Sequence, residues 1–285
     1  MTTRMSVPRF SISQITTLPA TFAEDLDAYR AAGAEGVGIW ELKIPEGGEA
    51  DALAALDASG LESTNAVPNV PSILPLRLLP GPEDPAERVA AYCASLRRLA
   101  PFRPSAVVLL TGPGDRSVVV DALRTIAAEA RASGLTVGVE PYSATHGGED
   151  WTIVNTIREA VDLIDEAGVA DDVGVLFDLW HLWNAPELEG DLADHADRIV
   201  GAHVCDVRDP TRSFADRLLP CDGVADVPRV LRLLDNAGWD GFYDLEIFSD
   251  DGSMGTPLPD SLWHVPAPDL ARRGRQAFLS CWERR

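Results

Sequence analysis

The sequence lacks the paired cysteines of metal-binding and disulfide-rich domains. Its four cysteines, Cys93, Cys205, Cys221 and Cys281, are far apart, and no CxxC pair occurs. This spacing argues against both a disulfide framework and a structural zinc site. We therefore expect all four to be buried thiols in a reducing compartment.

Leader segments and long apolar runs are also missing. The first residues, MTTRMSVPRFSISQITT, contain no basic segment followed by an apolar one. A membrane-spanning helix requires about 18 or more consecutive apolar residues, and the sequence contains no such run. These absences predict a cytoplasmic protein.

Basic residues are scarce. The 285-residue chain has 24 Lys and Arg against 45 Asp and Glu, which gives a formal net charge of −21. Proteins bind polyanions by neutralising phosphates with Lys and Arg, and so negative a surface repels them instead. We therefore expect neither nucleic acid nor an anionic membrane as a partner. Most of the acidic side chains are expected to solvate the surface, and a few could hold a cation.

Apolar residues are abundant by comparison, at 46% of the chain, which is enough for a full hydrophobic core. Eight short segments rich in branched apolar residues alternate with longer segments whose apolar residues have helical spacing. The expected strands begin near Phe10, Gly36, Leu61, Ala106, Thr136, Val173, Ile199 and Phe242.

This alternation predicts a (β/α)8 TIM barrel that forms a single domain over residues 1–285. Strand–helix repeats imply parallel strands with right-handed crossovers, and eight repeats in about 250 residues have the size of this barrel. Glycine is expected to end several helices, at Gly33, Gly60, Gly134, Gly168 and Gly238. A doubly wound open sheet is the alternative, but it requires a glycine-rich loop after the first strand, and ITTLPATF has no glycine.

Three connections that follow expected strands are long, at residues 67–85, 207–226 and 249–266. Loops that follow the strands of a barrel gather at its carboxyl end, where substrate pockets form.

Four consecutive strands end on residues that can bind a metal. One such residue alone would more often be a turn former, a helix cap or a core residue. Four at matching depth predict a site for one divalent cation, and an oxygen-rich set with one nitrogen favours Mn²⁺, with Mg²⁺, Co²⁺ or Zn²⁺ as alternatives. The four residues are Glu140, Asp178, His203 and Glu246.

Strand periodicity places further residues below these candidates. Gly138 and Gly201 share a strand face with Glu140 and His203, and we expect them to leave space at the barrel mouth. Asp244, two residues before Glu246, is expected to point into the barrel.

The residues at these strand ends resemble a known family, the xylose isomerase-like TIM barrels. This family includes D-tagatose 3-epimerase, inosose isomerase and dehydratase, and hydroxypyruvate isomerase. The resemblance runs from about residue 10 to residue 250. It rests on the VEP segment at Glu140, the D-x-x-H of Asp178 and His181, the strand residue His203, and Glu246 in DLEIFS.

The resemblance implies a role for each matching residue. Glu140, Asp178, His203 and Glu246 would bind the metal, and Glu140 and Glu246 would be the catalytic residues, on opposite sides of the substrate carbon. His181 and an arginine would hold substrate oxygens.

Two arginines compete for that last role, Arg208 in HVCDVRDPTR and Arg217 in DRLLPCDG. The second segment is similar to the L-P-G-D-G turn of the family, but Cys221 replaces its usual glycine. Trp40 and Trp180 stand at strand ends, where each could stack on a sugar or simply pack under the loops.

Endonuclease IV shares the expected fold but uses additional His and Glu ligands for a multi-zinc site. At the ends of strands two, three and four this sequence offers Glu41, Asn65 and Thr111 instead. This difference and the negative charge argue against a nuclease.

The predicted activity is that of a metal-dependent isomerase or epimerase. Its substrate would be a ketose, an inosose or a related hydroxy-ketone sugar or polyol, deprotonated by a glutamate to a metal-stabilised enediolate. One alternative is a lyase or dehydratase acting on a keto-cyclitol, a dehydroshikimate-like acid or a 3-keto-glycoside, because the same proton abstraction begins that reaction. A second alternative is a non-catalytic accessory barrel. A homodimer or homotetramer is also expected.

Overall fold

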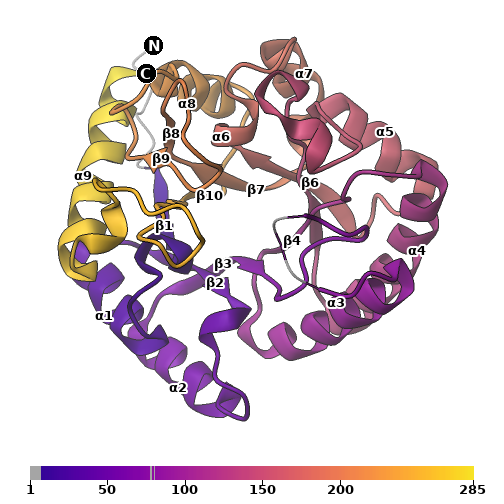
Figure 1. Ribbon diagram of the computed structural model, residues 1–285, viewed down its shortest axis with the longest axis horizontal. Coiled ribbons are helices and arrows are strands. Elements are labelled where there is room, and N and C mark those ends of the chain that lie inside the picture. The colour runs from indigo at the N-terminus through magenta and orange to yellow at the C-terminus, as the bar shows by residue number, and fades with distance from the viewer. Residues whose placement is uncertain (1–7, 78, 80) are drawn as a thin grey trace.

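Eight parallel strands close into a barrel in the computed structural model, which describes residues 8–77, 79 and 81–285. The strand order around the barrel is β1-β10-β7-β6-β5-β4-β3-β2, and helices surround it (Figure 1). This confirms the predicted TIM barrel, and every barrel strand begins within one residue of its expected position. The strands are β1 (Arg9–Ser13), β2 (Gly36–Trp40), β3 (Glu62–Val67), β4 (Ala106–Leu109), β5 (Val137–Val139), β6 (Val173–Asp178), β7 (Ile199–Val204) and β10 (Phe242–Leu245).

A helix or helix pair follows each barrel strand. Glycines in the left-handed conformation cap four of the helices as predicted, for example Gly33 with φ of 81°, whereas the C-cap residue of α8 is Ala237 and Gly238 lies one residue further on. The α-helices are α1 (Phe22–Ala32), α2 (Glu49–Ser59), α3 (Pro85–Leu99), α4 (Arg116–Ser133), α5 (Ile157–Ala167), α6 (Leu179–Leu182), α7 (Leu188–His195), α8 (Val227–Asn236) and α9 (Ala267–Arg284). The 3₁₀ helices are η1 (Gln14–Thr17), η2 (Glu41–Lys43), η3 (Ala100–Phe102), η4 (Ala144–His146), η5 (Gly148–Asp150), η6 (Ala196–Arg198) and η7 (Leu262–His264).

The barrel interior is filled by side chains rather than left open. A Cβ atom at Gly201, below His203, would overlap the side chains of Asn65 and Leu176. The space that these glycines were expected to leave at the mouth is therefore occupied by side chains from neighbouring strands. Asp244 is fully buried in this interior, where Thr64 Oγ1 donates a hydrogen bond to it at 3.2 Å. It thus points into the barrel as predicted.

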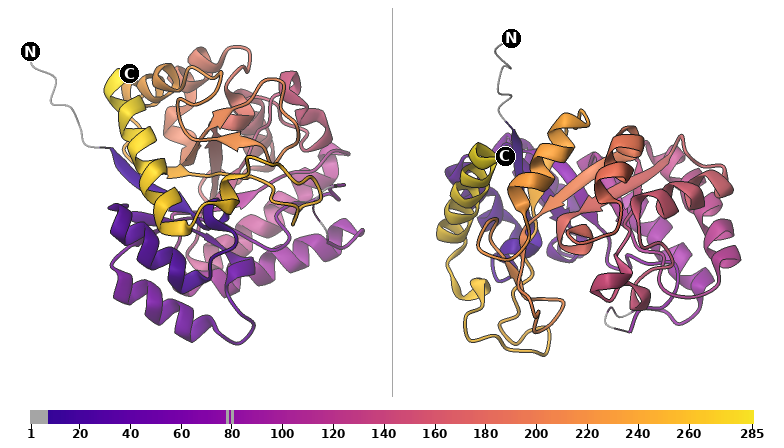
Figure 2. Two further views of the ribbon diagram at one scale, coloured as in Figure 1. Left: turned by 60° about the vertical axis from the view of Figure 1, so that its left-hand side comes forward. Right: turned by 90° about the horizontal axis from the view of Figure 1, so that it is seen from above.

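Loops after β7 and β10 lie together at the carboxyl end of the barrel. The first contains a small antiparallel pair, β8 (Asp206–Val207) and β9 (Arg217–Leu218), which the sequence did not predict. The backbone N–H of Arg217 donates to Phe248 O at 2.9 Å and so joins this pair to the segment after β10. Figure 2 shows both loops extending from the same end of the molecule. The third long connection, 67–85, is confirmed as the span between β3 and α3, with residues 78 and 80 outside the described residues.

The expectation of four thiols is wrong for one pair of cysteines. Cys221 and Cys281 form a disulfide with a Cα–Cα distance of 6.1 Å, while Cys93 and Cys205 are free and buried. The two partners are 60 residues apart, one in the loop after β9 and the other near the end of α9. Only the fold brings them together, so their spacing gave no signal. Disulfides are rare in reducing compartments, and the cysteines therefore no longer support that assignment.

One buried ion pair connects α1 with the segment after β2. The chain contains a single lysine, Lys43, whose Nζ donates to Asp25 Oδ2 at 2.6 Å and to Thr17 O at 2.8 Å. The two charged side chains are 4% and 0% exposed, respectively.

None of the helices in the described part of the chain combines the length and apolar character needed to cross a bilayer. Residues 1–7, which were part of the argument against a leader segment, lie outside the described residues.

Candidate metal centre

Neighbouring strands deliver the four predicted ligand residues to one volume at the carboxyl end of the barrel. Asp178 ends β6 and lies in register with His203 on β7. Glu140 directly follows β5, where its N–H donates to Leu109 O, and Glu246 directly follows β10, where its N–H donates to Val204 O. All four side chains are buried.

The donor atoms of this cluster are within reach of a single ion. One atom each from Glu140, Asp178 and His203 lie within 4.8 Å of one another. Glu246 lies beside these three residues, with its Oε2 3.3 Å from His203 Nδ1, and is the fourth candidate ligand. Ligands on opposite sides of a divalent cation are about 4 to 5 Å apart, so these separations suit one ion.

His203 gives an independent indication that the cluster fits a cation. Both of its buried ring nitrogens lack a hydrogen-bond partner within the described residues. Its Nδ1 is near Glu140 and Glu246, at 3.7 and 3.3 Å, but neither contact has hydrogen-bond geometry. An unpaired buried nitrogen is costly unless a ligand or ion satisfies it. Three carboxylates and one imidazole would therefore hold a divalent metal well.

Electrostatics lead to the same conclusion. Burial raises the pKa of Glu140 to about 7, and the charges of Asp178 and Glu246 add to this shift although His203 opposes it. Burial also disfavours ionised Asp178, but Arg217, His181 and His203 outweigh it and lower the pKa of Asp178 to about 2. Burial disfavours charged His203 too, yet Glu246, Glu140 and Asp178 hold its pKa well above the usual value. The cluster thus needs positive charge to keep its carboxylates ionised.

Of the two candidate arginines, the structure brings only Arg217 to this cluster. Its Nη1 lies 2.8 Å from Asp178 Oδ2 and 2.9 Å from Glu246 Oε2, and it is 4% exposed. Arg208 instead pairs with Asp216 at 3.2 Å and with Asp260 at 3.0 Å, and it is not among the residues that line the cavity described below.

The turn that carries Arg217 keeps a glycine-like conformation despite the cysteine. Cys221 has φ of 67°, a region that favours glycine. Its disulfide to Cys281 and the carboxylate of Asp206, which accepts hydrogen bonds from the N–H groups of Gly223 and Ala225, hold the loop in place.

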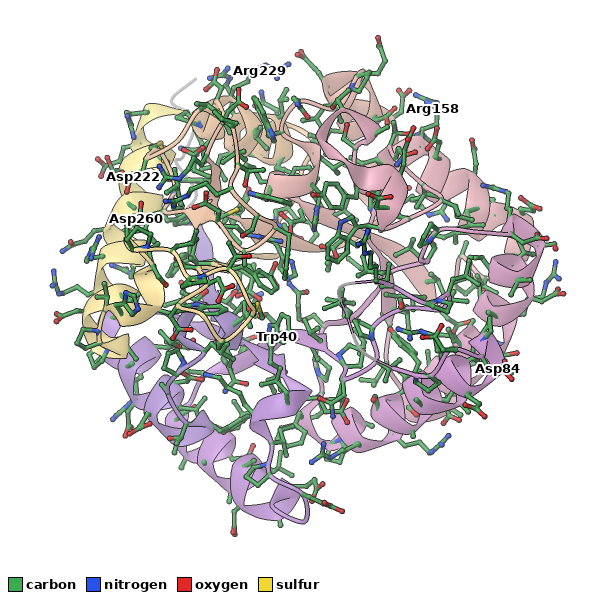
Figure 3. All side chains as sticks on the ribbon, viewed as in Figure 1. Trp40, Asp84, Arg158, Asp222, Arg229 and Asp260 are labelled. Carbon is green, nitrogen blue, oxygen red and sulfur yellow. A yellow bond between two sulfur atoms is a disulfide. The ribbon has the colours of Figure 1, made fainter. Side chains whose placement is uncertain are left out.

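A cavity of about 520 Å³ opens above the cluster. Glu140, His203 and Glu246 line the end of this cavity that is nearest the strands. The predicted substrate-binding residues Trp40, Trp180, His181 and Arg217 also line it. Figure 3 shows Trp40 near the centre of the molecule, in contrast to Arg158, Arg229 and Asp84 at its rim.

His181 and Trp180 are fixed by the same short helix. His181 Nε2 lies 3.3 Å from Asp178 Oδ2 and 3.8 Å from Glu140 Oε1. Asp178 caps this helix, because its Oδ1 accepts a hydrogen bond from the N–H of Trp180 at 2.7 Å. The cap leaves Oδ2 facing the cluster.

The residues that stand where endonuclease IV would have additional metal ligands have other partners in this structure. Glu41 binds Arg98, Ser95 and the backbone of Asn69. Asn65 contacts Asp244 inside the barrel, and Thr111 bonds Thr152.

Four aromatic residues of the cavity were missed by the sequence analysis. Tyr142 and Phe248 follow Glu140 and Glu246 by two residues and line the same cavity, so strand periodicity could have found them. Trp151 and Phe214 lie in irregular segments that carry no periodic signal.

A protein-family model described as "xylose isomerase-like TIM barrel" matches residues 26–281. The chain belongs to this family. The xylose isomerase-like fold accounts for the parallel barrel and for the site at its carboxyl end. A comparison with curated proteins gives no match.

Solved structures of similar fold include a protein from Sinorhizobium meliloti 1021, with 25% identity, coverage of 97% of this chain and 99% of that one, and a TM-score of 0.82. An IOLI protein crystallised with a zinc atom has 16% identity, coverage of 97% and 98%, and a TM-score of 0.77. The 3-keto-D-glucoside 4-epimerase of E. coli has 17% identity, coverage of 96% and 99%, and a TM-score of 0.71. Structural neighbours of this xylose isomerase-like chain thus include a sugar epimerase, and the two similarities below 25% identity concern the fold.

Proposed function

We propose that the protein is a divalent-metal-dependent isomerase or epimerase of a hydroxy-ketone sugar or a related polyol. The observation that carries this proposal is the cluster of Glu140, Asp178 and His203 at the end of a cavity, with Glu246 beside His203 and with neither ring nitrogen of His203 hydrogen-bonded within the described residues. Family membership and the epimerase among the structural neighbours support it.

Each residue has a role in the proposed reaction. A cation held by the four residues would act as a Lewis acid on adjacent carbonyl and hydroxyl oxygens of the substrate. Glu140 after β5 and Glu246 after β10 are separated in the barrel by β6 and β7, so they reach the substrate from different directions. One glutamate removes the proton next to the carbonyl. The other returns a proton, either to the opposite face of that carbon or to its neighbour.

His181 and Arg217 are the proposed holders of substrate oxygens. Arg217 is always charged, and its guanidinium contacts ligand oxygens on β6 and after β10. It can therefore donate to an oxygen that becomes negative as the proton leaves.

The proposal is tested by hydrogen exchange in D₂O. Protein loaded with Mn²⁺ is incubated with ketoses, inososes and 3-keto-glucosides, and deuterium at the carbon next to the carbonyl is followed by NMR. We expect exchange with formation of a new isomer. Release of water or an alcohol would identify a lyase instead.

Glu140→Gln should lower the exchange rate by about 10² to 10⁴-fold, the usual contribution of a general base. Glu41→Gln is the matched control, because it removes another buried glutamate at a strand end that binds Arg98 and Ser95 rather than the cluster. Equal rates in the two variants would refute the role of Glu140. A metal analysis that finds no bound cation, together with unchanged behaviour of Asp178→Asn, would refute the metal site.

A further inference from the structure

Six aromatic rings form a continuous series around the cavity, which we call the aromatic arc. Successive ring centroids lie 5.5 to 6.1 Å apart. Their order is Trp180, Tyr142, Trp151, Phe214, Phe248 and Trp40, and all six line the cavity.

The arc is closed by aliphatic side chains. Its rings come from the ends of β2, β5 and β6 and from the loops after β5, β7 and β10. Strands β3 and β4, which lie between β2 and β5 in the barrel order, contribute no ring to the arc. The cavity lining contributed there includes Val67, Pro68, Pro71 and Leu110. At the rim stands Leu42, one of the few large apolar side chains that are exposed, at 52%. Apolar groups therefore surround the cavity beyond the metal cluster.

Charged side chains gather at one end of the cavity. The acidic and basic side chains of the lining, those of Glu140, His181, His203, Arg217 and Glu246, contact one another there. Apart from Asn69, Ser253 and the hydroxyl of Tyr142, the other described residues of the lining offer aromatic, aliphatic, proline or methionine side chains. Arg217 connects the two regions, because its guanidinium carbon lies 5.1 Å from the Trp180 ring and 4.7 Å from the Phe248 ring.

This distribution disfavours a free ketose. Such a sugar carries a hydroxyl on almost every carbon, and those remote from the ionisable end would be buried with few partners, which is unfavourable. A single aromatic ring can stack on the C–H face of a sugar, but a wall that is apolar all around suits a group without hydroxyls at its edge. A cavity of about 150 Å³ binds benzene. The volume of about 520 Å³ therefore has room for an aromatic ring beside the reacting carbons.

We propose that the substrate is a hydroxy-ketone that carries a flat apolar group, such as an aryl substituent, which the aromatic arc binds. This inference rests on the proposed function, since the metal end of the cavity would bind the hydroxy-ketone.

Matched substrates test the inference. Phenyl and methyl 3-keto-β-D-glucosides differ only in the apolar group, and D-tagatose serves as the free ketose. We expect the Mn²⁺-loaded protein to exchange the proton next to the carbonyl with D₂O with a kcat/KM roughly 10 to 100-fold higher for the phenyl compound, from burial of its ring. Equal values for the phenyl and methyl compounds would overturn the inference and leave the proposed function intact.

A double variant locates the effect. Trp151 and Phe214 are half-buried neighbours in the arc, at a centroid distance of 5.6 Å, so their truncation leaves the barrel strands untouched. Trp151→Ala with Phe214→Ala should reduce the phenyl-to-methyl ratio to less than about threefold. Trp239→Ala, a half-buried tryptophan outside the cavity lining, should preserve the wild-type ratio. A ratio unchanged in the double variant would refute the role of the arc.

Failure of the proposed function would be recognised separately. If no compound exchanges, binding of the phenyl and methyl glucosides is measured by tryptophan fluorescence, because Trp40, Trp151 and Trp180 line the cavity. Tighter binding of the phenyl compound, lost in the double variant, would still support the apolar ligand class. Equal binding would overturn it.

Discussion

Arg217 places a permanent positive charge where a metal would also reside. Its Nη1 contacts Asp178 and Glu246, two of the four proposed ligands, at 2.8 and 2.9 Å. Burial disfavours its charge, but these carboxylates hold its pKa above the usual value. The guanidinium and the cation therefore compete for the same oxygens, and the arginine can yield them when it binds substrate.

Arg217→Gln is consequently expected to bind Mn²⁺ about tenfold more tightly than the wild type, because it removes a nearby like charge. The same change should lower kcat/KM, since a substrate oxygen loses its partner. Calorimetric titration with Mn²⁺ measures the first effect and the D₂O exchange assay the second.

Arg208→Gln is the control, because Arg208 binds Asp216 and Asp260 away from the cluster. Weaker Mn²⁺ binding in Arg217→Gln than in this control would show that Arg217 supports the metal rather than competing with it.

Among single residues, the sequence predicted those site residues that lie on barrel strands or directly after them. Asp178 and His203 could be placed because they lie near the carboxyl ends of the strands β6 and β7, and Glu140 and Glu246 because they directly follow β5 and β10. The choice between Arg208 and Arg217 could not be made, because it depends on the path of an irregular loop. The same limit applies to Trp151 and Phe214.

Among the elements, α1 and η2 are connected by the buried pair of Asp25 and Lys43. Burial raises the pKa of Asp25 to about 6 from 3.8, although Lys43 opposes the shift. Burial also lowers the pKa of Lys43. The folded protein therefore holds the Asp25 proton more tightly than the unfolded chain. The contribution of this group to stability is greatest below pH 3.8 and is lost as the pH rises through about 6.

Lys43→Met should make this dependence steeper. At pH 8 the variant leaves Asp25 buried without a cation, which we expect to cost about 3 kcal/mol of unfolding free energy. Near pH 4.5 Asp25 is mostly protonated, so the difference from wild type should nearly vanish. Urea denaturation at several pH values measures both.

Arg116→Met is the matched control. It breaks an ion pair with Glu166 whose members are 42% and 51% exposed, so we expect a change below about 1 kcal/mol at every pH. A pH-independent loss in Lys43→Met would contradict the buried-pair interpretation.

The elements were predicted well because their signals are local. Periodicity located the eight barrel strands, and glycines marked the ends of α1, α2, α4 and α5. The pair β8 and β9 was missed because two strands of two residues each have too few positions to show alternation. Contacts distant in sequence help to stabilise that pair, such as the one between Arg217 and Phe248 in the segment after β10.

For the molecule as a whole, the Cys221–Cys281 disulfide ties the loop after β9 to the C-terminal helix. The partners are 60 residues apart, and a chain-entropy estimate for a loop of this size is about 4 kcal/mol. Nothing in the cysteine spacing predicts such a pair, because it depends on α9 packing against the loops that follow β7.

Cys281→Ser should therefore lower the melting temperature by several degrees, and dithiothreitol should lower that of the wild type to the same value. The variant itself should not respond to the reductant, which is the internal control. Four free thiols in the denatured, unreduced wild type would contradict the disulfide.

The single lysine has a practical consequence. Because the only side-chain amine of this 285-residue chain is 4% exposed, acylating reagents can reach it only when α1 and η2 separate. The rate at which Lys43 is acylated under native conditions thus reports local opening of the barrel wall, and peptide-level mass spectrometry separates it from acylation of the N-terminal α-amine.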